Sequence, residues 1–325
     1  MPHDIGDWTY YFLREGSDKD AADMKHAMVL LLCEKLCLAP IKDPKRIGEL
    51  GTGTGIWAID MGDEHPEAEV VGIDLHPSQP GWTPPNVSFV LDDFENMPGG
   101  FTDDNPWCPS FRSPEYVFGR DLNLAIKDFS AVVRHAFKYA TSICVGIMAY
   151  FPKLSSLTSG GWIEFQFLDH RVKSEAESFD SDHPIPRFWD LVGKGISALG
   201  FNPTTCWQGI VSEILDEQGF VDVVETAVKI PVGQWPKMKS LKLAGAYWEV
   251  ISVTSAESIA QVPLSRGLKW EQDRIDEEVS CFKTAMKNHK DLHKRLMYTE
   301  YRVVYGRKPS AESQLDPKSD NVEGR

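Results

Sequence analysis

Three glycines within five residues carry the strongest chemical signal in this sequence. Gly51, Gly53 and Gly55 lie in the run ELGTGTG, which follows a short apolar segment and precedes a segment with helical spacing. Glycines at such a turn let the backbone bend tightly and approach a ligand closely. The helix that follows would present unpaired N–H groups at its start. The run therefore predicts a ligand-binding loop.

Acidic residues end the next two apolar segments. Asp74 ends AEVVGIDL, nineteen residues past Gly55, and Asp92 and Asp93 end NVSFVLDD. Ligands in open α/β sheets bind outside the carboxyl ends of the strands, where the glycine loop and all three acids would meet. An acid at the end of the second strand can bind ribose hydroxyls. The pattern favours a ligand that contains a nucleoside.

The loop fits neither of two common nucleotide-binding motifs. The dinucleotide fingerprint GxGxxG requires a third glycine where this chain has Ile56, and the P-loop requires a GK[ST] that is absent. The missing glycine and the acid pair Asp92-Asp93 argue against an NAD-dependent oxidoreductase, which stays the third hypothesis for function.

Strand-like and helix-like segments alternate around the loop. Helical spacing in IWAIDMGDE and DFSAVVRHAFKYA separates apolar runs that predict five strands: RIGEL, AEVVGIDL, NVSFVLDD, EYVFGRDL and GGWIEFQFLD. This alternation predicts an α/β domain with a largely parallel sheet.

The flanking segments are simpler. We expect helices over 21–38, 187–199 and 210–218, a mostly helical stretch over 239–290, and a polar disordered tail over 310–325. FVDVVETAVKIPVG predicts one long strand or two short ones, and EYRVVYGRKP predicts the last strand.

Composition narrows the class of protein. The 325 residues carry 34 basic and 48 acidic side chains, a net charge of −14, which disfavours broad binding to nucleic acid. The six cysteines form no CxxC pair, which indicates a reducing compartment. No signal peptide and no run long enough to cross a bilayer is visible. We expect a soluble protein in the cytoplasm or the nucleus, without membrane association.

The segment ELGTGTGIWAIDMGDEHPEAEVVGIDL resembles motif I of class I S-adenosylmethionine-dependent methyltransferases. With QPGWTPPNVSFVLDDFEN, GGWIEF and VVYGRKP, the chain is similar to the fungal LaeA-like methyltransferases, also called the TAM-domain or UMTA group, over residues 21–309. Two segments, 97–105 and 140–157, depart from the family pattern. They are either native insertions or products of retained introns, which transcript sequencing would distinguish.

The resemblance implies a Rossmann-like fold with a seven-stranded, mostly parallel sheet whose last strand is antiparallel. It implies a helical N-terminal lid over 1–40 and a methyltransferase domain over 41–309, with a helical cap over about 239–295. The cofactor implied is S-adenosylmethionine. The cofactor-binding residues implied are Glu49, Gly51, Thr52, Gly53, Gly55, Asp74, Leu75, Asp92, Asp93, Gly119 and Arg120.

Roles within this set also follow from the resemblance. The loop with Glu49 would surround the methionine and ribose part, Asp74 would hold the ribose hydroxyls, and Asp92 or Asp93 would face the adenine amino group. Gly119 and Arg120 would lie beside the sulfonium.

The acceptor side is less defined. Methyl transfer demands positioning more than a particular catalytic side chain, so we assign no catalytic residue. The candidates for the substrate pocket are Tyr10, Tyr11, Glu164, Gln166, His170 and Trp248. His289 and His293 have a spacing compatible with metal binding, but lysines and an arginine flank them, so we expect no metal.

The first hypothesis is methyl transfer to the oxygen or nitrogen of a small molecule, in fungal secondary metabolism. An aromatic, apolar cap would suit a small apolar or aromatic metabolite. The second hypothesis is a LaeA-like nuclear regulator of secondary-metabolite genes that acts through protein partners with little or no turnover.

Overall fold

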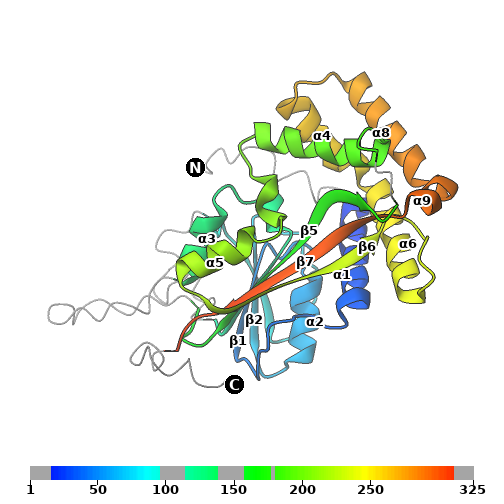
Figure 1. The fold of residues 1–325 in the computed structure, drawn as a ribbon. Helices are drawn as coiled ribbons and strands as arrows, with labels where there is room; N and C mark the ends of the chain where they lie inside the picture. Colours follow the sequence, from blue (N-terminus) through cyan, green and yellow to red (C-terminus); the bar gives the residue numbers. More distant parts are fainter. Residues whose placement is uncertain (1–15, 96–113, 138–156, 177–179, 311–325) are drawn as a thin grey trace, which may run out of the picture.

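The sheet contains seven strands in the order β3-β2-β1-β4-β5-β7-β6 (Figure 1). The computed structural model describes residues 16–95, 114–137, 157–176 and 180–310. The strands are β1 (Arg46–Leu50), β2 (Glu69–Asp74), β3 (Val87–Leu91), β4 (Tyr116–Arg120), β5 (Trp162–Ser174), β6 (Val221–Pro231) and β7 (Met297–Arg307).

Strand direction confirms the expected class I architecture. The neighbours β3, β2, β1, β4 and β5 pair in parallel, whereas β7 is antiparallel to both β5 and β6. Four of the five residues of both β1 and β4 are buried. Parallel strands covered on both faces are apolar along nearly their whole length, which explains why RIGEL and YVFGR show no alternation.

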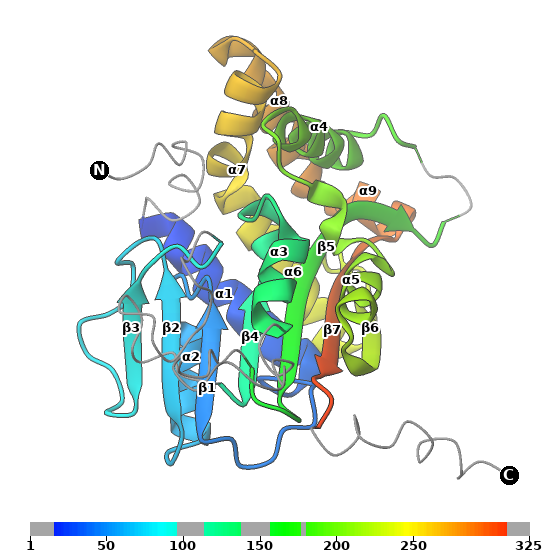
Figure 2. The ribbon, with the colours of Figure 1, turned by 90° about the vertical axis from the view of Figure 1, so that its left-hand side faces the viewer.

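Helices cover both faces of the sheet (Figure 2). On one face lie α1 (Gly16–Cys33), α2 (Ile56–Glu64) and α6 (Lys239–Thr254), and on the other lie α3 (Phe129–Phe137) and α5 (Ile210–Gln218). Trp57 of α2 stacks on Phe118 of β4 with ring centroids 3.9 Å apart. On the opposite face the rings of Phe129 and Phe165 meet edge to face at 4.7 Å.

A helical layer lies beyond the carboxyl ends of the strands (Figure 1). It contains α4 (Pro184–Ala198), α7 (Ala256–Val262), the π-helical turn η3 (Pro263–Gly267) and α8 (Gln272–Met286), and α9 (His289–Arg295) precedes β7. Phe188 of α4 stacks on Phe282 of α8 at 4.0 Å. Short 3-10 turns, η1 (Leu122–Leu124) and η2 (Pro203–Cys206), follow β4 and precede α5. The division into lid, domain and cap stays a prediction.

Two elements differ from the expected ones. The stretch 239–290 is not one helix, because Pro263 lacks the N–H that would continue α7 and the chain turns at Lys269, whose φ is 59°. Helix α1 starts at Gly16 and ends at Cys33, since Glu34 has a φ of 58°. FVDVVETAVKIPVG forms the single strand β6, one of the two alternatives expected, with a register shift between Val221 and Val224.

Two glycines let α4 and η3 touch through their backbones. A Cβ added at Gly195 would lie 2.3 Å from the carbonyl oxygen of Pro263, and one at Gly267 would lie 2.3 Å from the carbonyl oxygen of Gly195. Backbone atoms cannot yield as a side-chain tip does, so Gly195→Ala is expected to destabilise the fold by about 1–3 kcal/mol. Chemical denaturation would measure this loss.

Gly193 provides the matched control, because it lies in the same helix and an added Cβ there meets no heavy atom within 4 Å. Replacing a glycine inside a helix by alanine stabilises by about 0.5–1 kcal/mol. Gly193→Ala should therefore raise the free energy of unfolding. Two variants with equal stability would contradict the backbone contact between α4 and η3.

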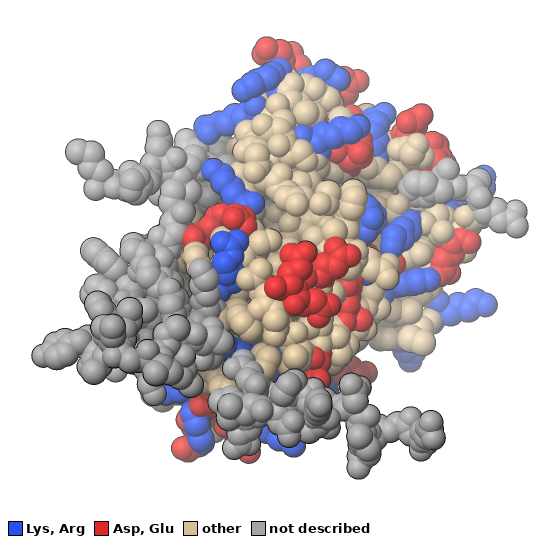
Figure 3. All heavy atoms as spheres, turned by 60° about the vertical axis from the view of Figure 1, so that its left-hand side comes forward, with Lys and Arg blue, Asp and Glu red and all other residues tan. Residues whose placement is uncertain are grey.

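Charges on the face drawn in Figure 3 are mixed. Acidic and basic side chains alternate over the upper part of this face, and a compact acidic group lies near its centre. The described residues on this face show no broad basic surface of the kind that binds nucleic acid.

Candidate active site

A cavity of about 640 Å³ opens at the carboxyl edge of the sheet. Residues from β1, β2, β4 and β5 line it together with residues from α1, α4, α6 and α7. Ten residues singled out in the sequence line this cavity: Glu49, Gly51, Thr52, Gly53, Asp74, Leu75, Asp93, Arg120, His170 and Trp248.

Other predicted site residues do not line the cavity. They are Gly55, Asp92, Gly119, Glu164 and Gln166. Tyr10 and Tyr11 lie outside the described residues, as do segment 97–105 and all but the last residue of segment 140–157.

The glycine loop joins β1 to α2 with all three glycines at positive φ, 66° at Gly51, 55° at Gly53 and 82° at Gly55. Side chains other than glycine rarely adopt this conformation. Gly55 precedes α2 and gives its first turn no side-chain cap. The start of α2 therefore points uncapped N–H groups toward the loop, as an anion or polar ligand requires.

Asp74 holds the loop from the neighbouring strand. Its Oδ2 accepts the backbone N–H of Gly53 at 2.7 Å, and its Oδ1 accepts that of His76 at 3.0 Å. Gln79 donates from Nε2 to the carbonyl oxygens of Gly53 and His76. The Asp74 carboxylate is thus fixed in the cavity wall, with lone pairs left for hydroxyl groups of a ligand.

Glu49 is a buried acid at the end of β1, with 3% of its surface exposed. Thr52 donates its hydroxyl to Oε2 at 2.5 Å. Burial disfavours the charged carboxylate and raises the pKa of Glu49 to about 8, despite the Thr52 bond and the charge of Arg120. A cationic ligand group beside Glu49 would favour its ionised form.

The raised pKa of Glu49 predicts a pH-dependent stability. Between its ordinary value of 4.5 and about 8 the folded protein holds a proton here that the unfolded chain has lost. The contribution of Glu49 to stability therefore falls as pH rises through this window. The free energy of unfolding of Glu49→Gln, relative to that of the unchanged protein, should increase from pH 5 to pH 9. Chemical denaturation would measure this difference. Glu69→Gln, an exposed position on β2, is the control and should show no such trend.

Helix α1 brings charged residues that sequence reasoning missed. Lys25 lines the cavity and pairs with Asp121 at 2.5 Å, and the other Asp121 oxygen accepts the N–H of Leu168. Asp121 has a φ of 54°, a strained conformation for this residue that often marks functional sites. Asp23 accepts a hydrogen bond from Thr54 of the glycine loop at 2.7 Å.

Arg120 is anchored rather than free in the cavity. It donates to Nδ1 of His26 at 2.9 Å and to Oε1 of Gln166 from two nitrogens. His26 is buried, and its other ring nitrogen lies 2.9 Å from Asp60. Burial and the charge of Arg120 lower the pKa of His26. The spacing of helix residues gave no signal for this chain of contacts from α1 to β4.

The aromatic end of the cavity consists of His170, Trp189, Trp248 and Ser252. The imidazole of His170 stacks on the indole of Trp189 with centroids 4.4 Å apart, and Trp189 stacks on Trp248 at 6.0 Å. Ser252 lies one turn after Trp248 on α6 and is 1% exposed. This end is therefore apolar, with few polar atoms.

Glu164 and Gln166 have structural partners. Glu164 accepts the backbone N–H groups of Leu38 and Ala39 at 2.8 and 2.7 Å and a bond from Gln166. Gln166 also accepts the hydroxyl of Tyr301 at 2.8 Å. They share one face of β5, as their alternation indicates, but that face is covered by the segment after α1.

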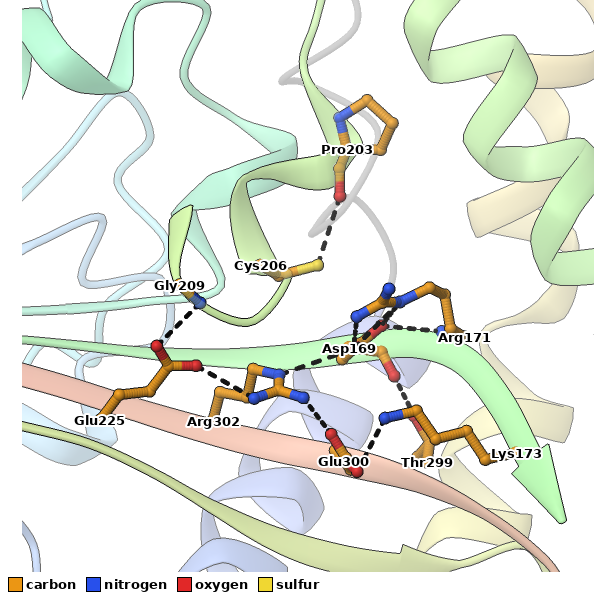
Figure 4. A network of polar contacts seen from close by, with 10 residues as sticks. All are labelled: Asp169, Arg171, Lys173, Pro203, Cys206, Gly209, Glu225, Thr299, Glu300 and Arg302. Atoms are coloured by element: carbon orange, nitrogen blue, oxygen red, sulfur yellow. Dashed lines mark hydrogen bonds and ion pairs between the residues drawn. The ribbon is translucent and has the colours of Figure 1, made fainter. Parts of the chain in front are cut away.

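A network of charges surrounds Asp169, the residue that precedes His170 in the sequence (Figure 4). Arg302 of β7, 4% exposed, binds Glu225 of β6 at 3.0 Å, contacts Glu300, and lies 3.6 Å from Asp169 of β5. Asp169 in turn binds Arg171 through both carboxylate oxygens. The pairing of β5 with β7 shifts register between Asp169 and Lys173, so His170 lies in a bulge.

Metal-ligating side chains do not gather in threes or more anywhere in residues 16–95, 114–137, 157–176 or 180–310. His289 lies 3.5 Å from a carboxylate oxygen of Glu249. None of the helices in the described part of the chain has the length and apolar character needed to cross a membrane.

The sheet order, the glycine loop and the acids at the carboxyl edge together define a class I S-adenosylmethionine-dependent methyltransferase. The buried Glu49, which lacks a cationic ion-pair partner among the described residues, and the fixed carboxylate of Asp74 fit the ammonium and ribose groups of that cofactor.

Comparison with known proteins gives the family. Methyltransferase pytC of Aspergillus terreus is 31% identical over 310 residues, which cover 93% of this chain and 84% of pytC. The secondary metabolism regulator laeA of Aspergillus flavus is 26% identical, covering 95% of this chain and 76% of laeA. The protein-methionine methyltransferase laeA of Emericella nidulans is 24% identical, covering 94% and 76%. The chain belongs to this family of fungal LaeA-like methyltransferases, and its cofactor is S-adenosylmethionine.

No protein-family model matches the sequence. Among solved structures, a putative methyltransferase of an antibiotic biosynthesis pathway from Anabaena variabilis superposes with a TM-score of 0.47 at 14% identity, covering 88% of this chain and 96% of that one. Phosphoethanolamine N-methyltransferase 2 of Haemonchus contortus gives 0.45 at 16% identity, covering 95% and 59%.

Proposed function

We propose that this chain transfers a methyl group from S-adenosylmethionine to an oxygen or nitrogen atom of a small molecule in fungal secondary metabolism. One observation carries the proposal: a single cavity runs from Glu49 and Asp74 to His170 and Trp248. A cofactor held at the first end leaves the apolar second end for an acceptor.

The position of three acidic residues in the wall of the first end supports a role for each of them in cofactor binding. Asp74 holds the ribose hydroxyls and Glu49 the ammonium group, while Asp93 lies on the adenine side. When bound, the cofactor supplies a methyl group on a positively charged sulfur. The chain supplies position and charge, because an in-line displacement gains most from holding the reacting atoms close and aligned.

The experiment is a calorimetric titration of the purified protein with S-adenosylmethionine, with NAD as a parallel ligand. Binding of S-adenosylmethionine in the micromolar range and none of NAD is expected. A folded protein that binds neither would contradict the proposal.

A protein acceptor is the alternative reading, because relatives carry the names regulator and protein-methionine methyltransferase. Incubation with methyl-labelled S-adenosylmethionine separates the two readings. Label that stays on the chain or on co-purifying protein favours the alternative. Label found only in small molecules extracted from an acceptor mixture supports the small-molecule reading.

A further inference from the structure

The aromatic end of the cavity holds two buried polar atoms that are not satisfied by the protein. Ser252 Oγ and His170 Nδ1 are buried and have no hydrogen-bond partner among the described residues. Leaving such atoms unpaired costs about 1–3 kcal/mol each. Both residues line the cavity, so a ligand there can supply the missing partners.

The wall around these atoms is apolar along one side. Trp248, Ile251, Ser252 and Ile259 line the cavity from consecutive turns of α6 and α7. Trp189 of α4 also lines the cavity and stacks on both His170 and Trp248. A ligand that fits this end is therefore mostly apolar and carries an oxygen atom that can form hydrogen bonds.

The charges at this end disfavour a cation. Asp121 is already bound by Lys25 and by the N–H of Leu168, and Asp18 accepts the hydroxyl of Ser258. Lys25 itself lines the cavity. An ammonium group here would face a lysine and find each of these two carboxylates engaged, which favours an uncharged acceptor.

His170 is uncharged at neutral pH in this setting. Burial lowers its pKa to about 4, although Asp121, which follows β4, and Asp169 of β5 attract its charged form, and Lys25 of α1 repels it. A neutral imidazole keeps one nitrogen with a free lone pair, which accepts a proton. No other histidine lines this end among the described residues.

We propose, resting on the function proposed above, that the aromatic end binds an uncharged, largely apolar acceptor by a phenol or enol hydroxyl, and that His170 accepts the hydroxyl proton during methyl transfer. The acceptor oxygen forms the new carbon–oxygen bond with a lone pair. The sulfur keeps both electrons of the broken carbon–sulfur bond, and the hydroxyl proton passes to His170 and then to water. Ser252 hydrogen-bonds a second oxygen of the acceptor or the same one.

The test uses two bicyclic probes of similar size, 2-naphthol and the cation of 1,2,3,4-tetrahydroisoquinoline, on the full chain loaded with S-adenosylhomocysteine. Calorimetry is expected to detect 2-naphthol and not the cation. Ser252→Ala should lower the affinity for 2-naphthol about 2- to 12-fold, which is the effect of losing one hydrogen bond. Equal binding of both probes, stronger binding of the cation, or no binding of 2-naphthol overturns the acceptor class.

The role of His170 is read from rate and affinity together. With S-adenosylmethionine, His170→Gln should lower the rate of 2-methoxynaphthalene formation about 100-fold or more while 2-naphthol affinity changes much less. His289→Gln, an exposed histidine on α9, should change neither. An unchanged rate in His170→Gln, or a loss explained by affinity alone, overturns the role of His170.

These outcomes are separate from failure of the proposed function. If S-adenosylmethionine does not bind the unchanged protein, the proposed function fails before the probes are used. If it binds and the probes give one of the overturning results, only the acceptor chemistry fails.

Discussion

Replacing Arg302 by methionine is expected to lower the free energy of unfolding by about 3–5 kcal/mol. Arg302 lies at the centre of the charge network of Figure 4, with Asp169, Glu225 and Glu300 around it. Its removal leaves three carboxylates in a region where Asp169 is fully buried and Arg302 only 4% exposed. Methionine replaces the apolar stem of arginine but not its guanidinium, so the loss reports the missing charge together with a small loss of packing.

The loss should also depend on pH. Arg171 and Arg302 hold the pKa of Asp169 below its usual range in the intact network, against the opposing effect of burial. A depressed pKa contributes stability at neutral pH that is lost as pH falls through the folded-state value. Without Arg302 the carboxylates repel one another, and protonation relieves this repulsion. The difference in free energy of unfolding between Arg302→Met and the unchanged protein should therefore become smaller as pH falls from 7 to 4.

Arg307 is the matched control on the same strand. It pairs with Asp222 through two nitrogens, but Asp222 is 54% exposed. A solvent-exposed pair contributes about 0–1 kcal/mol, so Arg307→Met should have little effect. If denaturation shows equal losses for both variants, the burial of the network does not determine its energy.

Asp74→Ala is expected to weaken binding of S-adenosylmethionine about 10- to 150-fold, as for one charge-assisted hydrogen-bonding group. The carboxylate both fixes the N–H of Gly53 and faces the cavity. 5′-Methylthioadenosine keeps the ribose and lacks the amino acid. Calorimetry should show that Asp74→Ala lowers the affinity for this ligand by a similar factor. Asp63→Ala, an exposed acid on α2, should leave both affinities unchanged.

The comparison of ligands decides what Asp74 does. A loss with S-adenosylmethionine that is absent with 5′-methylthioadenosine would remove Asp74 from the ribose. No loss with either ligand would mean that the loop keeps its shape and its ligand without this carboxylate.

The sheet was predictable because its signals are local. Each parallel strand is a short apolar run bounded by glycine or acid, and strand order follows from the resemblance. The breaks in 239–290 were not predictable from spacing, since Pro263 lies in a π-helical turn whose packing on α4 depends on Gly195, far away along the chain.

One half of the cavity lining was predictable from the sequence and the other half was not. Glycine loops and strand-end acids are recognisable from their position in the sequence. The sequence therefore predicted Asp74 and Glu49 at the cavity wall, while their contacts with the cofactor stay a prediction. Lys25 and Asp121 were missed because an ion pair between α1 and the end of β4 leaves no pattern in either segment. Glu164 and Gln166 look like pocket residues because central strands are buried on both faces, and alternation does not tell a pocket from a buried polar contact.

The position of β7 sets a condition on biosynthesis. β7 pairs with both β5 and β6, yet it is synthesised 123 residues after β5 ends at Ser174. At a translation rate of about 5–20 residues per second, β7 is synthesised roughly 6–25 s after β5. Open strand edges can pair with other chains, so the nascent polypeptide is exposed to wrong pairing during this interval. Slower translation between residues 174 and 297 would lengthen the time for which this edge of β5 is open.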